Sequence, residues 1–136
     1  MLLIGLIALA APVAGRCPDA NTTIEINACL AARAKAANAE MARYLAAARK
    51  RAGEESAEVV KAFDLAQTRW VAYRTADCDA VYANWQGGSI RGAMSIGCQI
   101  DLTEARTHWL WKTWLTYMDS TPPTLPEPKL SADGTS

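Results

Sequence analysis

The sequence predicts an all-α fold: a small, disulfide-stapled bundle in which a long antiparallel helical hairpin packs with a third helix. Three observations support it. An alanine-rich stretch of helical composition leads to Gly53, apolar residues then recur at spacings of three and four, and the four cysteines are even in number with no C-x-x-C pair. A chain of 136 residues that is 51% apolar can build one domain with a core, but not two.

The first helix is predicted over residues 21–53, "NTTIEINACLAARAKAANAEMARYLAAARKRAG". Thr22 stands three residues before Glu25, as in a capping box, and basic residues precede Gly53, as at many helix C-termini. Alanine has the highest helix propensity and lets a neighbouring helix approach closely. The bulky residues expected to pack are Ile24, Met41, Tyr44 and Leu45.

The second helix is predicted to begin near Glu54 and Glu55, because acidic residues suit a helix N-terminus. Spacings of three and four predict one packed face along it, made of Val59, Phe63, Ala66, Trp70, Tyr73 and Asp77. The short link at Gly53 predicts an antiparallel hairpin.

Beyond Trp85 the glycines of "QGGSIRGAMSIGCQ" predict an irregular loop. Asp101 and Glu104 then have the spacing of a capping box and predict that a third helix, "LTEARTHWLWKTWLTYMDS", begins there. Four prolines among small and charged residues predict a disordered tail over residues 121–136.

Residues 1–15, "MLLIGLIALAAPVAG", predict a signal peptide, because they are apolar, uncharged and end in small residues. The helical domain is then expected over residues 16–120, exported to the periplasm or secreted, with no stable membrane span. A retained anchor is the alternative, since no basic residue precedes the apolar stretch. Arg16 directly before Cys17 does not suit lipid attachment, which needs a small residue there.

The cysteines Cys17, Cys29, Cys78 and Cys98 predict two disulfides; their spacings of 12, 49 and 20 lack the paired knuckles of zinc sites. In a hairpin turning at Gly53, Cys29 and Cys78 lie at nearly the same height. This favours Cys29–Cys78 with Cys17–Cys98, while the local pairing, Cys17–Cys29 with Cys78–Cys98, remains open.

Composition argues against several function classes. The formal net charge of zero does not fit a nucleic-acid binder. The only histidine, His108, has no evident catalytic partners, so no enzyme activity, metal or cofactor is predicted.

The segments "TTIEINAC", "AQTRWVAYRTADC", "YANWQGGSI" and "CQIDLTEAR" resemble, in order and spacing, the LprI-like family over residues 17–115. The resemblance implies an exported bacterial helical domain, and one named member is a lipoprotein that inhibits lysozyme. The matching positions are Gln67, Trp70, Tyr73, Arg74, Cys78, Gly87, Gly88, Ser89, Cys98, Leu102, Thr103 and Arg106. Thr75 replaces the family's usual acidic residue, and Arg16 departs from a lipid-attachment site.

Within this motif, Trp70 and Tyr73 are expected to face the core. Arg74 is expected to form a partly buried ion pair or to cap carbonyls of the glycine-rich loop, and Arg106 to act similarly. Both arginines are therefore interpreted as structural.

Recognition is predicted at the loop, through Gly87, Gly88, Ser89 and Arg91, and at Trp111. Trp109, Trp111 and Trp114 cannot all be buried on one helix face, so at least one indole should be partly exposed. The predicted function is inhibition of a lysozyme-type muramidase through the loop, whose cation would meet two catalytic carboxylates. The alternative is a non-catalytic structural or interaction module that binds another envelope protein.

Overall fold

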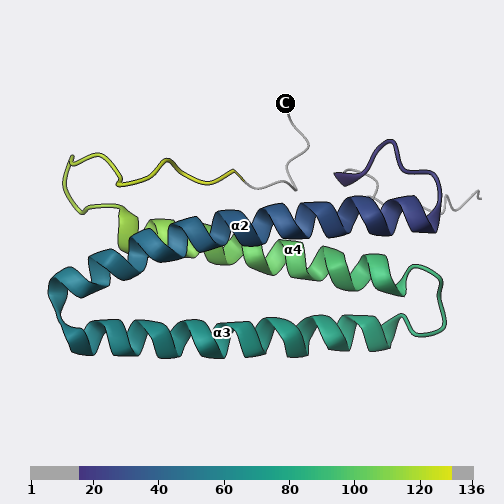
Figure 1. Ribbon diagram of the computed structural model, residues 1–136, viewed down its shortest axis with the longest axis horizontal. Coiled ribbons are helices and arrows are strands. Elements are labelled where there is room, and N and C mark those ends of the chain that lie inside the picture. The colour runs from purple at the N-terminus through teal and green to yellow at the C-terminus, as the bar shows by residue number, and fades with distance from the viewer. Residues whose placement is uncertain (1–15, 130–136) are drawn as a thin grey trace, which may run out of the picture.

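The computed structural model describes residues 16–129 and confirms the all-α prediction (Figure 1). Helix α2 spans Thr23–Glu55, α3 spans Ala57–Asn84, α4 spans Arg91–Leu110, and a π-helical turn, η1, follows over Trp111–Leu115. The three helices are antiparallel in order: α2 runs from right to left in Figure 1, α3 runs back from left to right, and α4 runs from right to left again. Helix α4 packs against both other helices. No strand and no helix capable of crossing a membrane occurs within residues 16–129.

Helix α2 begins as predicted, with Thr22 and Glu25 in a capping box. It ends later than expected, because Gly53 lies inside the helix and the chain turns at Ser56. The Ser56 hydroxyl accepts a hydrogen bond from the Val59 amide and so caps α3, which begins at Ala57 rather than at the glutamates. Ile24, predicted to pack, is 82% exposed.

The buried face of α3 differs from the predicted one beyond Phe63. Gln67, Trp70, Arg74 and Cys78 face the other helices, whereas Ala66, Tyr73 and Asp77 are exposed, Tyr73 by 55%. The apolar pattern was misleading because two polar side chains occupy the inner face, where they have partners.

These partners form a polar cluster, here called the Trp70 ladder, consisting of Asn38, Gln67, Trp70, Arg74, Thr103 and Arg106. The Arg74 Nη1 donates to Asn38 Oδ1 on α2 and to Thr103 Oγ1 on α4, both at 2.7 Å. The Arg106 Nε donates to Gln67 Oε1 at 3.1 Å. Both guanidinium groups lie over the Trp70 ring, 4.9 and 5.7 Å from its centroid.

The ladder corrects the predicted partners of Arg74, which are an amide and a hydroxyl rather than a carboxylate or loop carbonyls. Burial lowers the pKa of both Arg74 and Arg106 below the usual arginine value. Guanidinium stays protonated in proteins, so both side chains carry their charge inside the bundle.

Helix α4 begins at Arg91, ten residues before the predicted Asp101, which lies in mid-helix. The irregular segment is therefore only residues 85–90. Gly92 and Gly97 belong to the helix, and a side chain at either position would meet its neighbour at ordinary van der Waals distance. A Cβ added at Gly92 would stand 3.6 Å from the Asn27 side chain, and one at Gly97 would stand 3.7 Å from Arg16 Nη1.

The disulfides are Cys17–Cys29 and Cys78–Cys98, so the favoured pairing was wrong and the local alternative is correct. Cysteines at equal heights on two antiparallel helices do pair, but in the hairpin of α3 and α4 rather than in that of α2 and α3. Because α4 begins at Arg91, Cys98 on α4 lies beside Cys78 on α3, with Cα atoms 5.6 Å apart. The Cys17 sulfur is bonded to Cys29 and is not free to carry a lipid.

The core has two parts. The larger contains Met41, Tyr44, Ala48, Ala52, Phe63, Leu110 and Leu115, and the smaller contains Cys17, Leu30, Ala93 and Ile100. Trp114 packs edge-on against Phe63, with centroids 5.1 Å apart. Trp109 is 53% exposed, which confirms that the three tryptophans of the third helix cannot all be buried.

The segment before α2, here called the N-terminal arm (residues 16–22), is anchored beside the smaller core by the Cys17–Cys29 disulfide and by Arg16. Arg16 is 3% exposed and pairs with Asp101 on α4. The predicted signal peptide lies outside the described residues.

Residues 121–129, predicted to be disordered, instead lie in an extended conformation along α2 and α4 (Figure 1). Tyr44 on α2 and Trp111 on η1 donate hydrogen bonds to two carbonyl groups of this segment, which composition alone does not reveal. Residues 130–136 lie outside the description.

The disulfide pairing can be checked by tryptic mapping of the unreduced protein. The observed pairing places Cys17 and Cys29 together in the peptide 17–33, and links peptide 75–91 to peptide 92–106. Mass spectrometry should find these two species. A single assembly of all three peptides would contradict the structure.

Replacing Arg74 with alanine should lower the free energy of unfolding by about 2 kcal/mol, because it leaves Asn38 and Thr103 without their charged donor. Urea unfolding measures this change. Arg69→Ala, an exposed arginine on the same helix, should change stability by less than about 0.5 kcal/mol. Equal stability of the two variants would show that the ladder is not structural.

The capping box predicts a pH dependence of stability. Hydrogen bonds from the Asn21 and Thr22 amides lower the pKa of Glu25 below its usual 4.5 in the folded state. Its contribution is therefore fully present above pH 4.5 and is lost as the pH falls through the lowered pKa. In thermal unfolding, the advantage of wild type over Glu25→Gln should shrink with acidification. A gap that does not vary with pH would refute this assignment.

Candidate functional site

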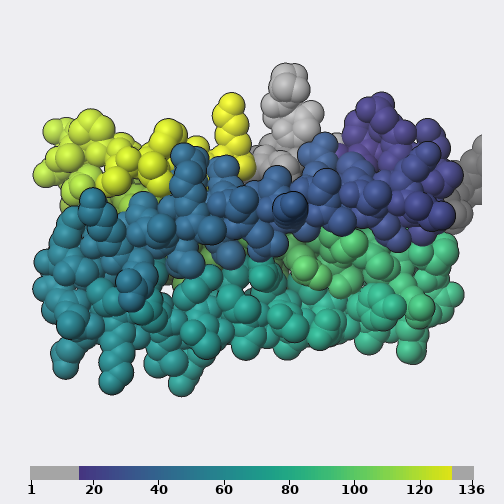
Figure 2. Space-filling model, in the orientation of Figure 1, coloured from purple at the N-terminus to yellow at the C-terminus, as the bar shows by residue number. Residues whose placement is uncertain are grey.

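The predicted recognition residues Gly87, Gly88, Ser89 and Arg91 lie together where the chain turns from α3 to α4. This turn, here called the tip, comprises residues 85–91. It lies at one end of the elongated bundle, opposite the turn at Ser56 (Figures 1 and 2). Ser89 and Arg91 are exposed, and a Cβ added at Gly87 would meet nothing within 4 Å. A partner surface can therefore approach the backbone here.

Short-range hydrogen bonds order the tip. The Gln86 amide donates to the Ala83 carbonyl at 3.2 Å, and the Gly88 amide donates to the Trp85 carbonyl at 2.9 Å. Arg91 lies over the Tyr82 ring, 5.1 Å from its centroid, and Nη1 donates to the Gln86 carbonyl at 3.5 Å. These last contacts are weak, so the guanidinium can turn toward a ligand.

The base of the tip is cross-linked. The Cys78–Cys98 disulfide joins α3 to α4, and the buried Ser95 hydroxyl donates to the Cys78 carbonyl at 3.2 Å. The tip therefore extends from two helix ends that are cross-linked to each other, which reduces the conformational entropy it loses on binding.

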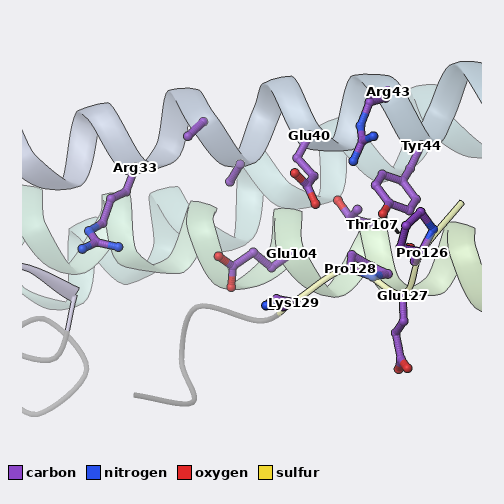
Figure 3. Close-up of a pocket in the computed structure, with 12 residues that line it drawn as sticks. Arg33, Glu40, Arg43, Tyr44, Glu104, Thr107, Pro126, Glu127, Pro128 and Lys129 are labelled. Carbon is purple, nitrogen blue, oxygen red and sulfur yellow. Dashed lines mark hydrogen bonds between the residues drawn. The ribbon is translucent and has the colours of Figure 1, made fainter. Parts of the chain in front are cut away.

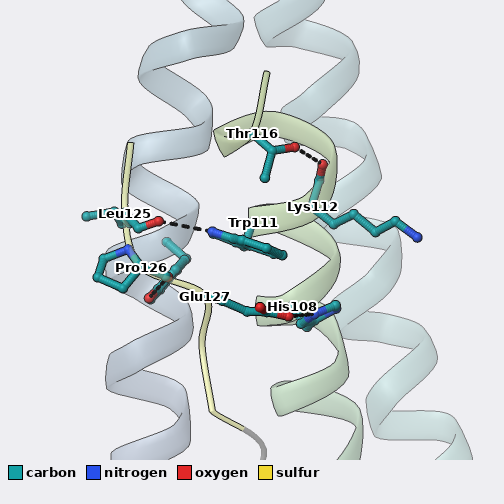
Figure 4. Close-up of polar contacts among 8 residues, drawn as sticks. His108, Trp111, Lys112, Thr116, Leu125, Pro126 and Glu127 are labelled. Carbon is teal, nitrogen blue, oxygen red and sulfur yellow. Dashed lines mark hydrogen bonds and ion pairs between the residues drawn. The ribbon is translucent and has the colours of Figure 1, made fainter. Parts of the chain in front are cut away.

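Trp111, the fifth predicted recognition residue, is not part of this surface. It begins η1, twenty residues beyond Arg91, which corresponds to about 30 Å along the helix axis. Its Nε1 donates to the Leu125 carbonyl at 3.0 Å, and its ring lies 5.4 Å from that of His108 (Figure 4). The tail thus covers Trp111 in part.

A cavity of about 450 Å³ lies between α2, α4 and the tail (Figure 3). Its lining carries charges of both signs, from Arg33, Glu40, Arg43, Glu104, Glu127 and Lys129. Burial raises the pKa of Tyr44 in its wall, and the Tyr44 hydroxyl donates to the Pro126 carbonyl at 2.7 Å. The sequence does not reveal this cavity, because its walls come from three segments that are separate in the chain, residues 33–44, 104–107 and 126–129.

His108 lies at the edge of this region, where its Nε2 is 2.9 Å from Glu127 Oε1 (Figure 4). In residues 16–129 no three histidine, cysteine or acidic side chains are grouped so that they could hold a metal ion. Leu102, the remaining motif position, is partly buried on α4 next to Thr103 of the ladder.

Comparison with known families gives one match, to the family described as lysozyme inhibitor LprI, over residues 15–110. No curated protein and no solved structure matches the chain. The matched segment contains all of α2, α3 and α4, both disulfides, the Trp70 ladder and the tip, and it ends before η1 and the tail. On the strength of this match, which covers most of the sequence, the chain belongs to the lysozyme inhibitor LprI family.

Proposed function

We propose that this protein inhibits a lysozyme-type muramidase by inserting the tip into the enzyme's cleft. The observation that carries the proposal is an exposed, cationic turn, cross-linked at its base, inside the segment that matches the lysozyme inhibitor family. The tip also contains Gly87, Gly88 and Ser89, three of the family motif positions.

The chemistry of the target supports this role for Arg91. Muramidases of the lysozyme type place two carboxyl groups on either side of the bond they cleave. A guanidinium can bind a carboxylate through two parallel hydrogen bonds, which are stronger than bonds between neutral groups. With Arg91 bound to one carboxylate and the Ser89 hydroxyl close by, the tip would occupy the site where the sugar substrate binds.

The glycines suit the same mode of binding. Gly87 and Gly88 carry no side chains, so the backbone of the tip can enter a cleft that is shaped for a polysaccharide. The disulfide keeps the ends of α3 and α4 together and so reduces the entropy lost on binding.

The proposed location is the periplasm or the exterior of the cell. Two disulfides are typical of proteins from oxidising compartments. With Cys17 bonded to Cys29, the mature inhibitor would act without a lipid anchor on that residue.

The purified oxidised protein should inhibit peptidoglycan lysis by at least one class of lysozyme at stoichiometric concentrations. Replacing Ser89 and Arg91 together with alanine should weaken inhibition at least about tenfold, because a charge-assisted hydrogen bond is lost. The matched control is Arg69→Ala/Thr75→Ala, which removes one guanidinium and one hydroxyl from exposed positions on α3.

Full inhibition by the Ser89/Arg91 variant would show that the tip does not take part in inhibition. Failure of the folded wild type to inhibit any lysozyme class would reject the function itself. In that case the alternative of a non-catalytic envelope-interaction module would be favoured, and the tip should be tested against envelope proteins.

A further inference from the structure

The tail lies on a groove between α2 and α4 that binds it through its main chain (Figure 4). The Trp111 indole N–H on η1 donates to the Leu125 carbonyl at 3.0 Å. The Tyr44 hydroxyl on α2 donates to the next carbonyl, that of Pro126, at 2.7 Å. Two aromatic donors from opposite walls thus bind consecutive carbonyl groups of one extended segment.

Side chains of the tail add two further contacts. The Glu127 carboxylate pairs with His108 Nε2 at 2.9 Å, and Pro128 is buried. Proline fixes φ near −65°, so Pro126 and Pro128 hold the segment extended before it binds. We call the surface formed by Tyr44, Thr107, His108 and Trp111 the tail groove.

We propose that the tail groove is a recognition site for extended, proline-containing peptides that carry a carboxylate between the prolines, and that residues 124–129 are its built-in competing occupant. Aromatic-lined grooves that bind extended proline-rich segments are a recurrent mode of peptide recognition. The features of the tail that the groove binds or buries, two carbonyls, one carboxylate and Pro128, are not peculiar to this tail.

Outside the groove, the Thr124 amide of the occupant donates to the Leu115 carbonyl at the end of η1, at 2.9 Å, and release of the occupant would break this hydrogen bond. Residues 116–123 belong to no helix and are mostly exposed, and the main core includes only Leu125 of the tail, at its edge. The cavity of about 450 Å³ beside Pro126 and Pro128 gives a longer or bulkier peptide room in the same place (Figure 3).

This site is distinct from the tip. It lies near the opposite end of α4. Tyr44, Thr107 and His108 fall inside the family match, which ends at residue 110, whereas Trp111 and the tail fall outside it. The inference therefore does not rest on muramidase inhibition, and either one can fail without the other.

The test uses the full chain and a labelled synthetic peptide, TPPTLPEPK, which copies residues 121–129. A tethered tail competes at an effective concentration in about the millimolar range, so wild type should bind the peptide weakly. Glu127→Lys/Pro128→Gly weakens the tail's own binding and should tighten binding of the peptide at least about tenfold by fluorescence anisotropy. Thr121→Lys/Pro122→Gly, which introduces the same two residue types outside the groove, should behave as wild type.

A second pair of variants tests the groove itself. Added to the Glu127→Lys/Pro128→Gly chain, Trp111→Phe removes the indole N–H and should weaken peptide binding about fivefold, the usual effect of one hydrogen bond. Trp109→Phe alters an exposed tryptophan two residues away and should change nothing. A peptide with its prolines replaced by alanine should also bind more weakly.

The proposal is overturned if the variant with the weakened tail, folded as judged by circular dichroism, binds the peptide no better than wild type. Equal effects of the two tryptophan variants, or equal binding of the alanine peptide, would overturn it as well. If the double variant fails to fold, Glu127→Gln removes only the carboxylate charge that faces His108. Its affinity for the peptide can be compared with that of wild type in the same way, and a smaller gain is expected.

Discussion

Two partly buried arginine side chains link the three helices of the bundle in one alignment. Arg74 on α3 reaches both α2 and α4, and Arg106 on α4 reaches back to α3, while Trp70 receives both guanidinium groups on its ring. Partial burial of a charge costs less free energy when its hydrogen-bonding groups have partners, so the ladder favours the helix register that gives both guanidinium groups their partners. Alanine-rich helix faces alone would permit several registers.

This register explains why the two ends of the molecule can differ. Beyond the ladder toward the tip, α3 and α4 approach closely enough for the Cys78–Cys98 disulfide, which leaves residues 85–91 as a short, exposed turn. Toward the other end, the helices enclose the larger core around Phe63 and Leu110. The tail then crosses the outer side of α2 and α4 and forms one wall of the cavity.

The disulfides reinforce the part of the molecule where the core is smaller, and Cys17 itself belongs to that smaller core. Cys17–Cys29 fixes the N-terminal arm to α2, where Arg16 pairs with Asp101 and lies against Gly97 of α4. Each cross-link closes a short loop, so each orders its own segment rather than joining distant ones. Both cross-links lie in the half of the bundle nearer the tip, and the other half depends on packing and on the ladder.

The sequence by itself determined the helical class, the first helix with its capping box, the presence of two disulfides and the family motif, because these depend on local composition and spacing. Periodicity also located Phe63 and Trp70 on the packed face, but it could not assign Gln67 and Arg74 to that face, since only their partners on other helices make their burial favourable. The sequence also placed the four predicted recognition residues of the tip close together, because they fall within the five residues 87–91. Disulfide pairing, the start of α4 and the tail groove were decided by tertiary structure, because each depends on contacts between segments whose relative position no local pattern contains.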